Sequence, residues 1–391
     1  MRLVKSVKQN YQPNAELLRL LEVFRSMVNA CLRIGIESQT TSLKSLSLRA
    51  YSKLSSFNIP SYYKLCAISK AAGILKNYRK SVKKNPRTRI PQARRLMLTT
   101  CYGFKVENGT LKLPLGERGY SEISLSNHTK EVLSNPAITV RAASLTPQSL
   151  SISYSKETAE IEPAGYIGID RNLDNVTTAD LTRVSQRYNL VKATETKRKY
   201  RDVKSHFKRN DARVRGLLYC KYGMKESNRV QQILHQVSKT IVQQAKDKQL
   251  GIAMEKLTGI RKLYRHGNGQ GSNYRFRLNS WSYAELQRQI EYKARWEGLP
   301  VIYVNPSGTS AKCSACGSRM MRIPEENRKL KCASCGFAVD RDVNAAKNIL
   351  ARALRFRAVG PAIEAMVQEP STKVILKVDA GQLTSTHPPT S

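Results

Sequence analysis

Four cysteines in the last quarter of the chain constrain its folding most strongly. They form two Cys-x-x-Cys pairs, Cys313 with Cys316 and Cys332 with Cys335, and fifteen residues separate the pairs. Two pairs at this spacing are typical of a zinc ribbon, in which each pair forms a tight turn and supplies two thiolate ligands. Because four thiolates leave no open coordination position, the predicted zinc is structural. A glycine follows each pair, as expected where a turn points backbone N–H groups at the sulfurs.

Two acidic residues each end a short apolar run earlier in the chain. Asp170 follows Ile167-Gly168-Ile169, and Glu255 follows Ile252-Ala253-Met254. Short apolar runs of this kind predict buried strands. Both carboxylates are therefore expected at the end of a strand in one sheet.

A third acid follows the cysteines directly, and either Asp340 or Asp342 could supply it. We favour Asp342 because Asp342-x-Asn344-Ala345-Ala346 opens a helix predicted over residues 345–354, which places this carboxylate near a helix N-terminus. Asp340 remains the alternative. Three carboxylates gathered on one sheet can hold two Mg²⁺ ions about 4 Å apart, and such a pair can drive phosphodiester hydrolysis. This arrangement predicts a nuclease site.

The charge of the chain favours a polyanionic partner. Its 391 residues carry 67 Lys and Arg against 29 Asp and Glu, a formal net charge of +38. A surplus of that size favours nucleic acid as the partner over an ordinary solvated basic surface.

Nothing in the sequence predicts a membrane protein or a secreted one. There is no run of about 20 apolar residues and no signal-peptide core at the start. We therefore expect a cytoplasmic protein, associated with the nucleoid of a prokaryote. The four remaining cysteines are scattered singly and are interpreted as buried thiols in a reducing compartment. They are Cys31, Cys66, Cys101 and Cys220.

The first 160 residues predict a β-domain interrupted by helices. Residues 3–12 read as a strand, and Asn14 is a candidate N-cap for a helix whose apolar residues recur at helical spacing. A second helix is predicted to start at Ser61. Short strands follow from residue 97, with a hairpin turn signal at Asn108-Gly109.

Residues 163–352 predict a separate α/β domain. The strand that ends at the first acid is followed by a neighbouring strand at residues 176–178. A helix over residues 230–241 leads to the strand that carries the second acid. A further helix over residues 282–296 leads to a strand at residues 301–304. After residue 357 the periodicity ends, and residues 358–391 are expected to form a mobile tail.

Three basic segments are candidates for contact with nucleic acid. The run from residue 76 to residue 95 contains no acid, which favours phosphate contact over a solvated helix end. A basic helical segment is predicted over residues 197–215. Residues 261–277 mix cations with aromatic rings, which suits either a single-stranded nucleic acid or an ordinary flexible loop. The candidates are Lys76, Arg79, Lys80, Lys83, Lys84, Arg87, Arg89, Lys197, Arg198, Lys204, Lys208, Arg209, Arg261, Lys262, Arg265, Arg275 and Arg277.

In their order along the chain, these motifs resemble those of the TnpB family, transposon-encoded RNA-guided nucleases related to type V CRISPR effectors. The resemblance is specific from about residue 165 to residue 352 and architectural before that. The segments that carry it are Gly168-Ile169-Asp170-Arg171-Asn172, Met254-Glu255-Lys256-Leu257, Ser280-Trp281-Ser282-Tyr283-Ala284-Glu285-Leu286, Thr309-Ser310, the two cysteine pairs with their glycines, and Asp340-Arg341-Asp342-x-Asn344-Ala345-Ala346.

The resemblance implies a multidomain α/β protein. It contains a RuvC-like, ribonuclease-H-like nuclease domain with an inserted zinc ribbon, preceded by a wedge β-barrel with a helical recognition insert. The implied domains are the barrel (1–13 and 96–160), the insert (14–95), the RuvC-like domain (161–310 and 338–357), the ribbon (311–337) and the tail (358–391).

The resemblance also implies the activity and the partners. It implies an RNA-guided DNA endonuclease of a transposable element, with Asp170, Glu255 and Asp342 holding Mg²⁺ or Mn²⁺ and the cysteines holding Zn²⁺. The partners are a guide RNA from the transposon end and target DNA, double- and single-stranded, with no membrane; a monomer with its RNA is expected. The alternatives are a nuclease-inactive RNA-guided DNA-binding regulator, which the intact acids disfavour, and a transposase that performs strand transfer itself.

One segment departs from the family pattern. Arg171-Asn172-Leu173-Asp174 stands where many relatives have a small or aliphatic residue and a glycine. We expect this departure to affect substrate access rather than metal binding.

Overall fold

The structure is a computed structural model of the chain. It describes residues 1–116, 119–182, 185–209, 211–260, 271–324 and 326–358. The predicted tail lies outside the described residues beyond residue 358. The contacts divide the chain into two compact units, which are described separately below. The first contains Met1–Glu162, Ile241–Lys246 and Arg288–Pro300, and the second contains Pro163–Thr240, Asp247–Gln287 and Val301–Ser391.

Among the described residues, no helix has both the length and the apolar character needed to cross a membrane.

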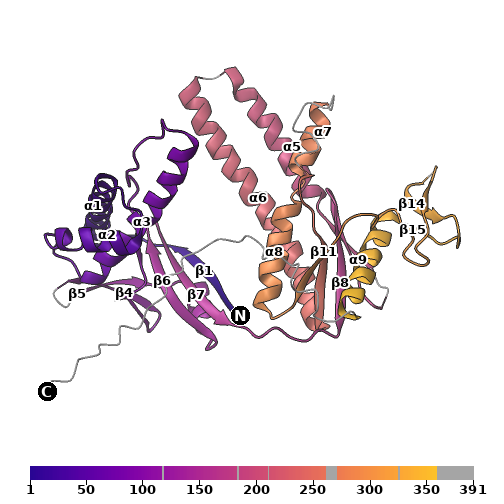
Figure 1. Cartoon of the computed structure of the whole chain (residues 1–391), viewed down its shortest axis with the longest axis horizontal. Helices are drawn as coiled ribbons and strands as arrows, with labels where there is room; N and C mark the ends of the chain where they lie inside the picture. The colour runs from indigo at the N-terminus through magenta and orange to yellow at the C-terminus, as the bar shows by residue number, and fades with distance from the viewer. Residues whose placement is uncertain (117–118, 183–184, 210, 261–270, 325, 359–391) are drawn as a thin grey trace. The chain divides into compact units, whose positions relative to one another are not determined.

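The helices of the first unit follow its first strand (Figure 1). They are α1 (Ala15–Glu37), α2 (Leu43–Ala50), the short 3₁₀ turn η1 (Ser52–Leu54), α3 (Ser61–Lys84) and, later in the chain, α4 (Asn127–Leu133). The predicted cap of α1 is confirmed, because the side chain of Asn14 accepts a hydrogen bond of 2.8 Å from the Leu17 N–H. Phe24, Met27 and Cys31 lie on the buried face of the same helix.

A four-stranded sheet joins the first strand to the strands that follow the helices. Its order is β1 (Arg2–Asn10), β7 (Ser149–Glu157), β6 (Ile138–Leu145) and β2 (Leu98–Thr100). Strand β1 pairs with β7 along its whole length, from Arg2 opposite Glu157 to Asn10 opposite Ser149. The helices are therefore inserted between two paired strands, as the sequence predicts.

The remaining strands of this unit form a second sheet of three, β3 (Lys105–Glu107), β4 (Thr110–Gly116) and β5 (Gly119–Ser124). Asn108 and Gly109 both have positive φ, which confirms the predicted hairpin turn. In the described residues no pairing joins the two sheets, so hydrogen bonding does not close the expected barrel. The edge strands β2 and β3 have three residues each, which leaves few backbone groups for further pairing.

The second unit is built on a five-stranded mixed sheet with the order β10-β9-β8-β11-β12 (Figure 1). Its strands are β8 (Gly165–Arg171), β9 (Asn175–Ala179), β10 (Ser185–Asn189), β11 (Leu250–Glu255) and β12 (Val301–Val304). Strands β8, β9 and β10 pair antiparallel, whereas β8, β11 and β12 run parallel. The strands predicted to end at the first two acids therefore lie side by side.

Helices connect the strands of this sheet in the sequence. They are α5 (Val191–Ser205), η2 (His206–Arg209), α6 (Ala212–Asp247), α7 (Ser272–Ser280), α8 (Tyr283–Trp296) and α9 (Arg341–Ala358). Residues 241–246 of α6 and the part of α8 from Arg288 onward belong to the first unit. Two expectations are corrected. The segment 261–277 is not a loop throughout, because residues 272–277 belong to α7, while residues 261–270 lie outside the described part. Helix α9 begins four residues before the predicted residue 345, because Asp340 accepts hydrogen bonds from the N–H groups of Asp342 and Val343 and so caps it.

Helix α9 lies across β8, β9, β11 and β12. Its apolar face, with Ile349, Leu350 and Ala353, packs against Tyr166, Ala253 and Val304 of the sheet. This packing brings the first turn of α9 to the ends of β8 and β11, where the predicted acids lie.

The cysteine segment forms a small antiparallel sheet of three strands, β13 (Met320–Ile323), β14 (Glu326–Cys332) and β15 (Ala338–Asp340). Its core contains Met320 and Leu330 together with two of the cysteines.

Candidate metal centres

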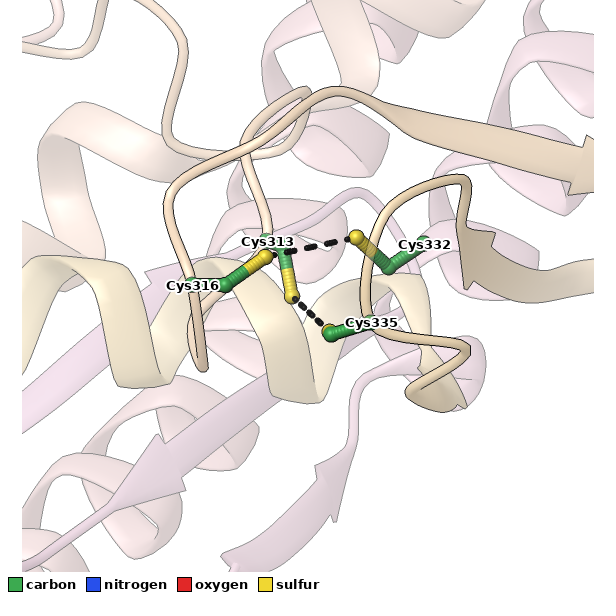
Figure 2. A group of neighbouring side chains, drawn as sticks. All are labelled: Cys313, Cys316, Cys332 and Cys335. Atoms are coloured by element: carbon green, nitrogen blue, oxygen red, sulfur yellow. Dashed lines mark hydrogen bonds between the residues drawn. The ribbon is translucent and has the colours of Figure 1, made fainter.

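The four cysteines lie together and face one another (Figure 2). All four sulfurs are within 4.8 Å of one another, with Sγ–Sγ distances of 3.8 Å for Cys313–Cys335 and 3.4 Å for Cys316–Cys332. A tetrahedral zinc with Zn–S bonds of about 2.3 Å would place its sulfurs about 3.8 Å apart. The thiolate set therefore fits a structural zinc in both number and spacing.

The two cysteine turns repeat the same backbone geometry. The Gly317 N–H donates to the Cys313 carbonyl, and the Gly336 N–H donates to the Cys332 carbonyl. Both glycines have positive φ, +80° and +70°, a conformation that strains residues with a Cβ. The predicted tight turns are thus confirmed, although the glycine N–H groups meet carbonyl oxygens, and it is the Ala315 N–H that donates to the sulfur of Cys313, at 3.4 Å.

Three buried carboxylates gather at one edge of the larger sheet. Asp170 is near the end of β8, Glu255 ends β11, and Asp342 is in the first turn of α9, with exposures of 7%, 8% and 6%. The last residue pair between β8 and β11 is Ile169 with Met254, so Asp170 and Glu255 are the next residues along adjacent parallel strands. The structure therefore brings together all three acids that the sequence predicts.

The environment of Asp170 raises the pKa of its carboxyl group. Burial, followed by the nearby charge of Glu255, raises the pKa of Asp170 to about 7, and Asp342 adds to this effect. The side chain of Asn172 donates a hydrogen bond of 2.7 Å to Oδ2 of Asp170 and opposes the rise. The nearby guanidinium of Arg171 also opposes the rise but does not cancel it.

Glu255 is oriented by a residue that precedes the ribbon. The hydroxyl of Thr309 donates to Oε1 of Glu255 at 2.5 Å, and both groups are buried. The backbone carbonyl of Glu255 accepts from the guanidinium of Arg171. Thr309 thus orients the carboxylate of Glu255, and Arg171 holds the backbone of the same residue.

Asp342 is held by two arginines. Oδ2 of Asp342 accepts from Arg187 of β10 at 3.3 Å and from Arg328 of β14. Arg187 is opposite Thr177, which is itself opposite Asp170, so that these residues form one row across the sheet. The guanidinium groups therefore reach the same face of the sheet as the acids.

The alternative acid, Asp340, has a different place. Besides capping α9, its Oδ1 accepts from Arg187 at 2.7 Å. Burial would raise the pKa of Asp340, but the hydrogen bonds from Arg187 and from the Asp342 N–H outweigh it and lower the pKa. Helix capping already uses one oxygen of Asp340, so Asp342 remains the better candidate for a metal ligand.

The acids fit divalent cations by chemistry. Carboxylate oxygens are the ligands that Mg²⁺ prefers. Among the described residues, however, it is the four cysteines whose ligand atoms lie close enough together to bind one ion. The carboxylate oxygens of the three acids lie farther apart than that. In this arrangement the guanidinium groups of Arg187 and Arg328 supply positive charge at Asp342.

The residue after Asp170 turns inward. Arg171 is 2% exposed, and its guanidinium donates to the side chain of Gln287 at 2.6 Å and to the Tyr283 carbonyl as well as to Glu255. Burial lowers its pKa to about 10, so it stays charged at neutral pH. Arg171 therefore ties the ends of β8 and β11 to the start of α8.

Comparisons with known proteins agree with this arrangement. The family model described as the Cas12f1-like TNB domain matches residues 283–349, which include the cysteines and Asp342. The TnpB-like protein MJ0751 of Methanocaldococcus jannaschii is 31% identical over 262 residues, which cover 63% of this chain and 91% of that protein. The chain belongs to the TnpB family.

Other relatives of this TnpB-family chain match over shorter lengths. A CRISPR-associated endodeoxyribonuclease Cas12f1 of Sulfoacidibacillus thermotolerans is 39% identical over 120 residues, 29% of this chain and 25% of that protein. A putative RNA-guided DNA endonuclease InsQ of Escherichia coli is 34% identical over 93 residues, 23% of each chain. The chain thus spans about a quarter of these two relatives.

The fold of the TnpB-family chain is similar to that of a solved Cas12f1 chain. A cryo-EM structure of a Cas12f1–sgRNA–target DNA complex matches with a TM-score of 0.54 at 16% identity, over 85% of this chain and 81% of that one. At this identity the likeness concerns the fold alone.

The basic candidates of this TnpB-family chain fall into three groups. Exposed side chains on α3, the segment after it, α5 and α7 are Lys76, Arg79, Lys80, Lys83, Lys84, Arg87, Arg89, Arg198, Arg275 and Arg277. Lys197 and Lys204 instead have partners within the protein: Lys197 donates to Ser280 and Ser282, and Lys204 pairs with Glu226 at 2.6 Å. Arg261, Lys262, Arg265 and the side chains of Lys208 and Arg209 lie outside the described part of the chain.

Sequence reasoning missed several residues of the site. Arg187 and Arg328 gave no signal, because a single arginine in a polar strand is ordinary and their ion pairs with Asp342 form only in the folded structure. Thr309 and Asn172 lay inside motifs that carried the family resemblance, but their hydrogen bonds to Glu255 and Asp170 depend on the folded geometry.

Proposed function

We propose that this chain is an RNA-guided DNA endonuclease that hydrolyses phosphodiester bonds with two divalent cations. The observation that carries the proposal is the convergence of three buried carboxylates, Asp170, Glu255 and Asp342, from two parallel strands and a helix. The relatives named as RNA-guided DNA endonucleases support the reaction class. The sheet order, with three antiparallel strands followed by two parallel ones, supports a RuvC-like domain.

The three carboxylates would hold Mg²⁺ or Mn²⁺. Cations bound there would activate a water molecule and stabilise the leaving oxygen. The protein itself fixes the carboxylates in advance, because Asn172 binds one oxygen of Asp170 and Thr309 binds one oxygen of Glu255. Arg187 and Arg328 would leave Asp342 and lie beside the phosphate of the substrate, where guanidinium groups bind well.

A structural zinc in the cysteine cage would fix the ribbon, from which Arg328 reaches Asp342. The buried amide of Asn344 in α9 supports this link, because it accepts from the Ser314 N–H at 2.9 Å and donates to the Lys312 carbonyl at 2.7 Å. The first cysteine turn and the helix that carries Asp342 are thereby bonded to each other.

The partners follow from the charge and the exposed cations. A guide RNA from the transposon end and a target DNA would meet the basic side chains of α3, α5 and α7. Sequence would be read by base pairing with the guide, and the protein would contact mainly the phosphates. The net charge of +38 supports two such polyanions on one chain.

The test is to express the chain with its native downstream flank, sequence the RNA that co-purifies, and assay cleavage of a matching DNA. Asp170→Asn should abolish cleavage and keep the affinity for RNA and DNA within about twofold, since the substitution preserves shape and removes one ligand charge. Asp211→Asn, at an exposed residue whose side chain accepts from the Arg213 N–H at the start of α6, is the matched control and should cleave like the wild type, because asparagine can make the same cap. Cleavage by Asp170→Asn at the wild-type rate would refute the assignment.

A further inference from the structure

A pocket of about 230 Å³ is lined by Asn172, whose side chain donates to Asp170, and the proposed mechanism does not use it. Its wall is formed by Asn172, Leu173, Tyr274, Arg277, Leu278 and Trp281, all within the second unit. Asn172 is shared between the pocket and the acid site, because its side chain also donates to Asp170. A group in this pocket would therefore lie one side chain away from the acids.

The wall combines aromatic and apolar surface with one cation. Tyr274 and Trp281 supply rings, Leu173 and Leu278 supply aliphatic surface, and the exposed Arg277 supplies the charge. Pockets for drug-sized ligands have volumes of about 300–1,000 Å³, so this pocket suits a smaller flat group. A nucleobase has a π-face for the rings and edge atoms that an amide such as Asn172 can bind.

One donor in the pocket wall has no partner. Among the described residues, Nε1 of Trp281 is a buried nitrogen that makes no hydrogen bond. An unsatisfied buried donor is unfavourable, and an acceptor on a ligand could satisfy it after a small rotation of the ring. Base edges carry such acceptors.

The helix that carries Tyr274 and Arg277 is anchored. The Lys197 ammonium donates at 2.7 Å to both the Ser280 carbonyl and the Ser282 hydroxyl, at the end of α7. Arg201 donates to Ser272 at the start of α7 and lies over the ring of Phe276, 4.5 Å from its centroid. Because both ends of α7 are bound to α5, the pocket exists before any ligand enters.

We propose that this pocket receives one unpaired base of the DNA strand under cleavage, next to the bond that is cut. Tyr274 stacks on the base, Asn172 and the indole N–H of Trp281 contact its edge, and Arg277 binds a flanking phosphate. Holding one base fixes the adjacent phosphate relative to Asp170, and this would favour a single-stranded substrate, whose bases are free to enter the pocket. The inference rests on the proposed nuclease function and adds to it how the strand is positioned.

The test uses the full chain with its co-purified guide RNA. 2-Aminopurine, whose fluorescence falls on stacking, is placed in turn at each DNA nucleotide within two positions of the mapped cut. Binding is measured in the Glu255→Gln background, so that the strand stays intact. One position should be quenched, Tyr274→Ala should remove the quenching, and Tyr274→Phe, which keeps the ring, should retain it. Tyr120→Ala is the control, because Tyr120 is 47% exposed, similar to the 40% of Tyr274, and lies in the other unit.

A second measurement separates base binding from general damage to the protein. In the wild type, an abasic nucleotide at the quenched position should lower kcat/KM roughly tenfold, the typical effect of losing one stacked base. In Tyr274→Ala the same abasic nucleotide should change kcat/KM less than twofold, because the contact is already absent. Equal abasic effects in both proteins, or the absence of quenching at every DNA position tested, would overturn the proposal.

Failure of the parent function would be distinguishable. If the wild type cleaves no guided target, the nuclease proposal fails. The pocket would then be judged on a single-stranded oligonucleotide alone, where Tyr274-dependent quenching supports base binding and its absence overturns it.

Discussion

The contact between β8 and α9 can be tested by adding a single methyl group, Gly168→Ala. A Cβ on Gly168 would lie 2.3 Å from the carbonyl oxygen of Ala346 and 2.7 Å from the backbone nitrogen of Leu350, both in α9. The φ of Gly168 is not in the positive region, so close approach of helix and strand is what requires glycine here. Its neighbours across the sheet, Ala253 and Ala179, are also small and fully buried.

The expected losses of stability and of cleavage rate follow from that geometry. Real Cβ contacts are essentially never under 3.0 Å, so helix and strand must separate by about 0.7 Å. Overpacking of a core typically destabilises a protein by about 1–3 kcal/mol. Because the atoms met here belong to the backbone and cannot rotate away as side chains do, we expect a loss of about 2–3 kcal/mol. Ala346 lies one turn after Asp342, so the same displacement moves that carboxylate relative to Asp170. Misplacement approaching 1 Å lowers rates on the order of 10- to 100-fold.

The assay compares thermal unfolding with guided cleavage. Gly168→Ala should lower the Tm by roughly 5–10 °C for a unit of this size and lower the cleavage rate while RNA binding persists. Gly216→Ala in α6 is the control: an added Cβ there meets nothing within 4 Å, so the helix should gain about 0.5–1 kcal/mol. If Gly168→Ala were as stable as the wild type within about 0.5 kcal/mol, the close packing of α9 on β8 would be wrong.

Two further predictions concern zinc and pH. Cys332→Ser should reduce bound zinc from about one ion per chain to near zero by elemental analysis; wild-type zinc content would contradict the cysteine cage. Burial lowers the pKa of Lys5 to about 8; the charge of Glu297 opposes this shift, and Lys293 and Lys156 add to it. Because the unfolded chain then binds more protons than the folded protein, the wild type becomes more stable as pH rises from 8 to 10.5. Lys5→Met should therefore raise stability by about 1–2 kcal/mol at pH 7, after allowance for solvent screening, and this gain should shrink by pH 10; a gain independent of pH would refute the reasoning.

Features set by short stretches of sequence were predictable. The cysteine spacing, the glycines after each pair, the Asn14 cap and the Asn108-Gly109 turn each depend on a few adjacent residues, and the structure bears them out. The strands that end at Asp170 and Glu255 were also predictable, because fully buried strands are continuous apolar runs.

Features that depend on distant partners were not predictable. The basic residues illustrate this. Lys197 and its exposed neighbour Arg198 stand in the same basic segment and look alike in the sequence, yet the ammonium of Lys197 donates to Ser280 and Ser282 at the end of α7. Arg171 is a second case. An arginine after a strand reads as exposed, whereas here it is buried among carbonyls and Gln287 because two acids lie beside it.

Hydrogen bonds join the ribbon to the acid site at both ends of the ribbon segment. Thr309, just before the first cysteine, donates to Glu255, and the side chain of Asn348 in α9 donates to the Thr309 carbonyl at 2.7 Å. Asn344 holds the first cysteine turn from the other side. Loss of zinc would free the cysteine turns and so loosen the hydrogen bonds that fix Glu255 and the start of α9. In Cys332→Ser, cleavage should accordingly fall together with zinc content, whereas an independent ribbon would lose zinc and leave the cleavage rate unchanged.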